Sequence, residues 1–443
     1  MPDNPATGRR RPYQTALLVV ALAAAGLNLR TAITNLPPLF PDLASRLHLS
    51  SATLSLLAAT PVICFGVASA FAAWLNRRFG EEMTLLAALG VLATGILLRG
   101  LWPGALLFPG TILAASAIGI LNVLLSSLVK RRWPERADLL VGIYLTGLSV
   151  GAIASSLLSV PLYHASGGSI PLALGVWAGP AALAMLLWLP QLRYRAPGLG
   201  RSAATVPPVS AQRGAPAAAT APGGHIKVYR YALSWQVMWF MGLQSLLYYA
   251  ALSWLPTIWQ DHGASAVEAG NLLGLMGAGN MVAAFFVPAL AHRSSDQRAL
   301  VIPSMALVGL GLVACLWAPM SLAAIWTFLL GVAQGSCLAL SIFFMMARAP
   351  DPGVAASLSG FAQSVGYLVA SAGPLEVGLL HSATGSWDIP IALLLVLAVV
   401  GIVVGVLAAR PLVLPAGPGG PGGNGGADSP PVRGGLRGVI PPG

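Results

Sequence analysis

The sequence predicts an all-α membrane protein with twelve transmembrane helices in two bundles of six helices. Three observations lead to this fold class: the composition, the recurrence of apolar runs and the distribution of basic residues. The chain of 443 residues is 56% hydrophobic and only 8% charged, whereas soluble domains carry about 25% charged residues. A helix needs about 20 mainly apolar residues to cross the hydrocarbon core of a bilayer, and runs of this length recur along the chain.

The apolar runs fall into two groups of six. The expected spans of the first half are 13–38, 51–75, 83–101, 104–128, 138–161 and 169–190. Those of the second half are 231–259, 266–291, 299–318, 321–347, 353–380 and 388–409. We therefore assign residues 13–190 to an N-terminal six-helix bundle and residues 231–410 to a C-terminal six-helix bundle.

Three further segments are not apolar. Residues 1–12 are expected to form a short N-terminal tail. Residues 191–230 are rich in Pro, Ala and Gly without apolar periodicity, which predicts a flexible linker. Residues 411–443 are of low complexity and are predicted to be disordered. The start of the chain also has the basic and apolar regions of a signal peptide, but we expect it to remain as the first span.

The basic residues predict the orientation of the chain. Of the 24 Lys and Arg residues, all but three fall on the side that holds both termini and the linker. Arg46 and Arg99 are assigned to the opposite side, and Arg30 lies inside the first span. Because Lys and Arg accumulate in cytoplasmic loops, we expect a multi-pass protein of the bacterial inner membrane with cytoplasmic termini and a cytoplasmic linker.

Several function classes lack the residues that they need. The net charge of +11 is spread over short clusters between apolar runs, so no nucleic-acid partner is expected. The chain has no P-loop, no HExxH and no CxxC pair, and Cys64, Cys315 and Cys337 lie apart inside apolar runs. The string "GLSVG", residues 147–151, matches a nucleophile elbow but lies within a span, where its glycines predict helix packing. We predict no enzyme, no cofactor and no metal site, in a monomer within the lipid bilayer.

The loop after the second span resembles a signature of the major facilitator superfamily. The stretch "AWLNRRFGEE" matches that signature at Arg78 and Gly80 and departs from it at Ala73, Arg77, Glu81 and Glu82. The resemblance implies a gating role, in which Arg78 bonds the end of a neighbouring helix in one conformation and releases it in another. The alternative is that these basic residues only set the orientation.

Four stretches resemble one family within that superfamily, the cyanate and 2-nitroimidazole permeases. They are "GLNLRTAITNLPPLFPDL", "IGILNVLLSSLVKRRWPER", "GASAVEAGNLLGLM" and "GFAQSVGYLVASAGP". The resemblance implies a small solute, such as an inorganic or heteroaromatic anion or a small planar neutral compound. The chain departs from the family pattern at Glu376, which leaves the coupling ion open.

Arg30 is the main candidate for the solute site. A charge in mid-membrane costs about 2.5–3.5 kcal/mol on insertion scales, so such a residue faces the bundle interior and marks a pathway. Arg30 and Thr34 share one helical stripe, and Asn28 lies on a neighbouring stripe. We expect the guanidinium to bind the solute and Asn28 to donate to it. The alternative is an Arg held only by protein groups.

The superfamily plan implies that the other walls of the cavity come from several helices. The polar residues that the expected spans offer there are Asn122, Tyr144, Gln244, Tyr248, Gln334, Gln363 and Tyr367. Hydrogen bonding between helices is the alternative role for each of them. Glu376 is the only carboxylate well inside a span, and it is a candidate proton carrier or a residue at the water boundary.

These observations predict a secondary transporter that moves a small solute by alternating access, with Arg30 in the central site. The resemblance implies cyanate or a similar small anion, or a nitroimidazole-like planar compound, and leaves import or export open. A multidrug-type efflux carrier is an alternative, and a membrane receptor or sensor without transport is another.

Overall fold

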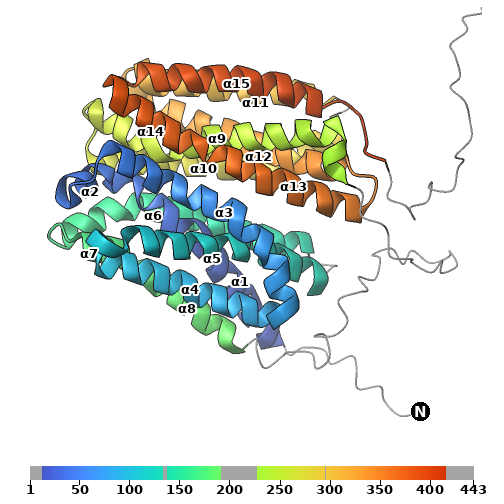
Figure 1. The fold of residues 1–443 in the computed structure, drawn as a ribbon, viewed down its shortest axis with the longest axis horizontal. Coiled ribbons are helices and arrows are strands. Elements are labelled where there is room, and N and C mark those ends of the chain that lie inside the picture. Colours follow the sequence, from blue (N-terminus) through green and yellow to red (C-terminus); the bar gives the residue numbers. More distant parts are fainter. Residues whose placement is uncertain (1–11, 133–136, 191–226, 295, 416–443) are drawn as a thin grey trace, which may run out of the picture.

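The computed structural model describes residues 12–132, 137–190, 227–294 and 296–415, and their regular structure is helical. The expected N-terminal tail up to residue 11, the linker residues 191–226 and the tail from residue 416 lie outside the described residues. Helices of the first half form one layer and helices of the second half form the other (Figure 1). The structure thus has the predicted arrangement of two bundles.

The N-terminal bundle contains six helical passages. The first passage is α1, and short helices η1 and α2 follow it; α7 and α8 together form the sixth passage. The bounds are α1 Pro12–Thr34, η1 Pro37–Leu39, α2 Phe40–Leu47, α3 Ser51–Phe79, α4 Glu81–Leu101, α5 Pro103–Arg132, α6 Ala137–Ala165, α7 Ile170–Gly175 and α8 Ala178–Trp188.

The C-terminal bundle repeats this plan. Its fifth passage is divided into α13 and α14, and two 3₁₀ turns precede α9 and α12. The bounds are η4 Val228–Arg230, α9 Ala232–Asp261, α10 Ala266–Arg293, α11 Arg298–Trp317, η5 Met320–Leu322, α12 Ala323–Ala347, α13 Pro352–Ala370, α14 Ala372–Thr384 and α15 Asp388–Ala408.

Helix α9 differs from the other passages in its polarity. Eleven of the described segments are long and apolar enough to cross a membrane, and α9 is not one of them. Its sequence, "ALSWQVMWFMGLQSLLYYAALSWLPTIWQD", mixes polar and aromatic residues with aliphatic ones. Most of its side chains are buried, and it packs against α10, α11, α12, α13, α14 and α15. Because protein surrounds it, α9 does not need a surface compatible with lipid.

The end of α1 is held by a buried cation from α4. Leu36 N–H donates to Ile33 O three residues back, since the chain turns toward Pro37, which cannot continue the helix. The carbonyl of Ala32 is thereby freed from its helical partner and accepts a bond from Arg99 Nη1 at 2.7 Å. Arg99 Nη2 donates to Asn35 Oδ1 at 3.2 Å. Arg99 is 0% exposed, so it packs inside the bundle, and its assignment to the side opposite the termini remains a prediction.

Two glycines of α6 allow α1 to approach closely. A Cβ atom on Gly147 would lie 2.7 Å from Ala23 O, and one on Gly151 would overlap Leu27 O. Gly26 of α1 likewise faces the backbone of Tyr144 in α6. The packing role predicted for "GLSVG" is therefore confirmed, because backbones that approach this closely leave no room for side chains.

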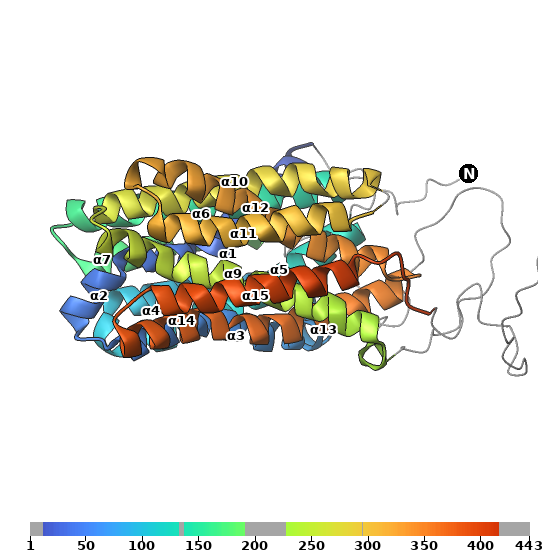
Figure 2. The ribbon, with the colours of Figure 1, turned by 90° about the horizontal axis from the view of Figure 1, so that it is seen from above.

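The two bundles meet along α6 and α10 and along α3, α13 and α14, as Figure 2 and the contacts between these helices show. Cβ atoms on Gly270 or Gly274 of α10 would lie 2.7 and 3.0 Å from atoms of α6. Gln260 donates to Pro38 O of η1 at 3.4 Å. The ring of Phe40 in α2 lies 5.8 Å from that of Trp254 in α9. The bundles are thus in contact at the end that holds η1 and α2.

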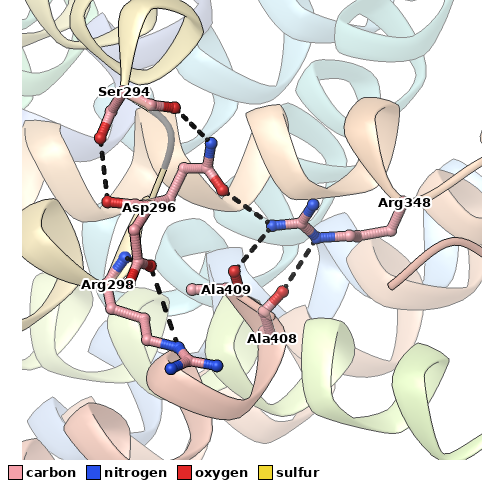
Figure 3. A network of polar contacts seen from close by, with 7 residues as sticks. Ser294, Asp296, Arg298, Arg348, Ala408 and Ala409 are labelled. Carbon is pink, nitrogen blue, oxygen red and sulfur yellow. Dashed lines mark hydrogen bonds and ion pairs between the residues drawn. The ribbon is translucent and has the colours of Figure 1, made fainter. Parts of the chain in front are cut away.

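A second buried cation, Arg348, joins elements of the C-terminal bundle at the opposite end. Its guanidinium donates to the carbonyls of Ala408 and Ala409 at 3.1 and 3.0 Å and to Gln297 Oε1 at 3.1 Å (Figure 3). Burial lowers the pKa of Arg348 below its ordinary value. The side chain thus satisfies carbonyls at the end of α15, which have no partner within the helix.

The same residue also contacts the first residues of the segment expected to be a disordered tail. Leu414 N–H donates to Arg348 O at 2.9 Å, and Leu414 is buried. Leu414 therefore packs on the bundle, within a segment expected to be disordered, whereas residues 411–413 and 415 are exposed. Three apolar residues between two prolines form too short a pattern for the sequence to predict this contact.

Candidate functional site

A small cavity lies between the bundles and brings Arg30 of α1 together with polar residues of the C-terminal bundle. About 10 Å³ of it is open to the centre of a water molecule, which is room for about one water. The side chains that line it are Arg30, Gln244, Ser245, Tyr248, Tyr249, Asn280, Gln334, Leu338 and Tyr367. In this conformation the bundles have therefore closed around the guanidinium.

Arg30 reaches across the interface to α9. Its Nη1 donates to Tyr248 Oη at 3.1 Å, and its Cζ lies 5.1 Å from the ring centroid of Tyr248 and 5.5 Å from that of Tyr249. Such cation–π contacts are worth about 0.5–2 kcal/mol each. They offset part of the cost of placing the charge in the membrane, about 2.5–3.5 kcal/mol on insertion scales. Among the described residues, no Asp or Glu is paired with Arg30, whose charge interactions are with tyrosines.

Aromatic rings from three helices form a cluster beside this cation. The rings of Tyr248 and Tyr249 lie 5.1 Å apart, nearly perpendicular to each other. Tyr367 of α13 lies 6.4 Å from Tyr249, and Phe65 of α3 lies 6.1 Å from Tyr367. Flat faces beside a planar guanidinium form a site that suits a flat solute, because rings stack and guanidinium forks bind in plane.

Two amide side chains add polar groups to the wall. Gln244 donates to Ser245 Oγ at 2.7 Å and to Met241 O at 3.2 Å, all within α9. Gln334 of α12 donates to Leu247 O at 3.4 Å, whereas its Oε1 is buried without a hydrogen-bond partner. The cavity therefore presents donors from Arg30 and an acceptor from Gln334.

Two residues predicted for the site lie on other faces of α1. Asn28 is 1% exposed and donates to Ala24 O at 2.8 Å and to Pro180 O of α8 at 3.1 Å. Thr34 is buried against α6, where its hydroxyl bonds Ser155 and donates to Arg30 O at 3.0 Å. Neither residue lines the cavity. Both bind neighbouring helices of their own bundle, which is the alternative that sequence left open for polar groups.

Three more predicted residues lie outside the cavity lining. Asn122 is exposed on α5, and Gln363 is exposed on α13 with its amide near Met345 Sδ. Tyr144 is buried on α6. The structure thus brings together Arg30, Gln244, Tyr248, Gln334 and Tyr367 of the predicted set.

The residues predicted for gating and proton coupling lie far from this cluster in the fold. Arg78 is exposed at the end of α3, and its Cζ lies 5.8 Å from the ring of Phe79. Gly80 has a φ of 81° between α3 and α4, a conformation that favours glycine. Glu376 is exposed on α14 and does not line the cavity. The roles assigned to these three residues remain predictions.

Sequence reasoning missed part of the lining. Ser245, Tyr249, Asn280 and Leu338 line the cavity but were not among the predicted residues. Asn280 carries a signal that was available, because it is an amide inside an expected span. Ser and Leu occur in most spans, so their type alone does not mark a site.

Comparisons with known proteins agree with this architecture. The family model described as Major Facilitator Superfamily matches residues 16–374 and 243–437. An uncharacterized transporter of Bacillus subtilis (strain 168), YycB, is 36% identical over 88% of this chain and 92% of its own length. A 2-nitroimidazole transporter of Escherichia coli (strain K12) is 33% identical over 89% of this chain and 95% of its own. The cyanate transport protein CynX of the same organism is 28% identical over 84% and 91%.

Solved structures support the fold. A bacterial homolog of the human lysosomal transporter Spinster, in an inward-facing and unoccupied conformation, has a TM-score of 0.70 and covers 91% of this chain and 98% of its own. The D-xylose-proton symporter also has a TM-score of 0.70, over 90% and 98%. At 16% and 12% identity these show the fold alone. With the family model and the relatives above, they show that this chain is a multi-pass membrane protein of the major facilitator superfamily, similar to its cyanate and 2-nitroimidazole permeases.

Proposed function

We propose that this protein is a secondary transporter of a small planar solute, with Arg30 at the centre of its binding site. The solute is a cyanate-like small anion or a nitroimidazole-like planar compound. The observation that carries the proposal is the contact of Arg30, from one bundle, with Tyr248 and Tyr249 of the other. A solute bound there contacts both bundles, so its access to either side of the membrane changes when the bundles move relative to each other.

Alternating access follows from this position. In major facilitator transporters the two halves rock around a site near the membrane midplane. The bundles are in contact at the end that holds η1 and α2. With the predicted orientation in the bacterial inner membrane, this is the outer end, and the conformation is closed to the outside. The relatives' names support the solute classes for this chain, since two of them are a 2-nitroimidazole transporter and a cyanate transport protein.

The test is solute flux in reconstituted vesicles with two Arg30 variants. Arg30→Gln removes the charge, and Arg30→Lys keeps the charge but loses the fork of donors and the planar stacking surface. We expect Arg30→Gln to lower uptake of cyanate or 2-nitroimidazole at least about 10-fold and Arg30→Lys to retain part of it, since hydrogen bonds to charged groups contribute about 1.5–3 kcal/mol.

Arg298→Gln is the matched control, because Arg298 is a partly exposed Arg outside the cavity lining. It should leave uptake unchanged. Wild-type rates in both Arg30 variants, in protein that folds as judged by its melting temperature, would remove Arg30 from the site. Flux without chemical change of the solute distinguishes a carrier from an enzyme, and binding without flux would favour a receptor.

A multidrug-type efflux carrier is a second candidate, because aromatic rings enclose the cavity. Rings of this kind stack on many flat ligands. Bulky drugs competing with small planar solutes for binding would favour this alternative. A proton-coupling role for Glu376 has its own test, in which transport driven by an imposed pH gradient is compared between wild type and Glu376→Gln.

A further inference from the structure

Gln334 has a buried acceptor that no protein group uses. The residue is 2% exposed, lies on α12 and lines the same cavity as Arg30. Its Oε1 has no hydrogen-bond partner among the described residues. A buried amide oxygen without a partner costs about 1–3 kcal/mol relative to a satisfied one. A polar atom of this kind in a cavity wall is therefore a site for a donor that arrives with a ligand.

The neighbouring backbone fixes which end of the Gln334 amide is already bonded and which end is free. Gln334 Nε2 donates to the carbonyl oxygen of Leu247 in α9 at 3.4 Å. A carbonyl accepts and cannot donate, so turning the amide over would place two acceptors against each other. The oxygen is consequently the end of the Gln334 amide that remains for a solute, whereas the Arg30 guanidinium offers only donors.

We propose that Gln334 selects solutes that carry an N–H or O–H donor beside an electron-rich edge. This inference rests on the proposed function and narrows its solute class. The acceptor edge, such as a nitro or carboxylate group, binds the guanidinium of Arg30. The donor of the same planar molecule binds Gln334 Oε1, and the rings of Tyr248 and Tyr249 lie beside it. A flat heteroaromatic with a ring N–H has both features, and cyanate has no donor.

The strength of the selection follows from burial. A site built to bond a ligand N–H or O–H rejects the analogue that lacks it, because the buried protein group is then left unpaired. Gln334 is 2% exposed, so water does not replace the missing donor once the solute fills the cavity. The expected loss of affinity for an analogue without the donor is about 10-fold or more.

The experiment compares two solutes that differ at one ring position. 2-Nitropyrrole has a ring N–H, and 2-nitrofuran has an oxygen at the same position in a ring of similar size. Dissociation constants are measured by isothermal titration calorimetry with the purified full chain. We expect wild type to bind 2-nitropyrrole at least about 10-fold more tightly than 2-nitrofuran. In Gln334→Met, which keeps the side-chain length but has no amide oxygen, the two should bind within about 2-fold of each other.

Gln363→Met is the matched control, because Gln363 is an exposed amide on α13 outside the cavity lining. It should keep the wild-type preference. Equal affinities of wild type for the two solutes would overturn the selecting role of Gln334 and leave the proposed function standing. A preference for 2-nitropyrrole that persists in Gln334→Met would have the same meaning. If wild type binds neither of these solutes nor 2-nitroimidazole nor cyanate, the proposed function fails along with it.

Discussion

Arg30 and Arg99 show how two guanidinium groups in one bundle obtain different environments. Arg99 uses its donors on the carbonyl of Ala32 and on Asn35, and it is fully buried. Arg30 makes one hydrogen bond, to a tyrosine hydroxyl of the other bundle, and lines a cavity. Arg99 therefore fixes the end of α1 at Ala32 and Asn35. In this way it holds the helix that carries Arg30.

Asn35→Ala tests this support at the residue scale. The change leaves Arg99 Nη2 buried without its acceptor, and an unsatisfied buried donor costs about 1–3 kcal/mol. We expect a lower melting temperature of the purified protein in detergent, measured by differential scanning fluorimetry.

Ser45→Ala is a suitable control, because Ser45 is an exposed polar residue of α2 at the same end of the molecule. This variant should have the same melting temperature as the wild type. A melting temperature for Asn35→Ala equal to that of Ser45→Ala would contradict a supporting role for Arg99.

The sequence predicted some residues of the cavity and misplaced others for one physical reason. Helical spacing puts Arg30 and Thr34 on one side of the first span, whereas Asn28, two residues before Arg30, lies about 160° away from it around the helix. Helix α1 packs against α5, α6 and α8 at once, so residues on different faces of the helix meet different neighbours. Spacing shows that Asn28 and Arg30 differ in direction, but only the packing shows that Asn28 meets α8.

At the scale of elements, close helix packing depends on glycines whose positions the sequence revealed. Gly147 and Gly151 lie one turn apart in α6, and both meet the backbone of α1. The expected bounds of the spans also agree with the helices, because hydropathy and Pro or Gly breaks mark them directly. The divisions of two expected spans, 169–190 into α7 and α8 and 353–380 into α13 and α14, were not predicted. In the second, Pro374 lies just after the break and lacks the N–H that a continuous helix needs.

Gly151→Leu tests the packing of α1 on α6. A Cβ at this position overlaps Leu27 O, so the two helices must separate, and overpacking of this kind costs about 1–3 kcal/mol or more. We expect a lower melting temperature and a lower yield of folded protein on size-exclusion chromatography.

Gly142 provides the comparison within the same helix, since a Cβ there meets nothing within 4 Å. Gly142→Ala should be neutral or should stabilise the protein by up to about 1 kcal/mol through its higher helix propensity. Equal effects of the two substitutions would show that α6 tolerates separation from α1.

At the scale of the molecule, Gly378 marks where the bundles close. It lies on α14, and a Cβ there would overlap Ser55 of α3 in the other bundle and Trp254 of α9. The indole of Trp254 is held in turn, since it donates to Pro374 O at 2.8 Å. Contact between the bundles at this end therefore requires a residue without a side chain.

Gly378→Val should prevent this closure. In protein whose native cysteines are replaced by alanine, spin labels at Ser45→Cys and His262→Cys report the distance between the bundles at the end that holds α2. We expect longer distances and slower solute flux in the variant, since the closed conformation then contains a steric clash.

Ala383→Val is the control on the same helix, because Ala383 is exposed. It should leave the distance distribution as in the wild type. An unchanged distribution in Gly378→Val would mean that the clash is relieved within the C-terminal bundle and that Gly378 does not limit closure.

The buried position of α9 has a consequence for biosynthesis. This helix emerges from the ribosome before α10 to α15, the helices that later cover its polar and aromatic side chains. Because its own partition into lipid is weak compared with the eleven apolar segments, we expect its stable insertion to wait for those successors. In chains cut after residue 261, a cysteine placed in this segment should react with a water-soluble maleimide, whereas in chains that continue through α15 it should be protected.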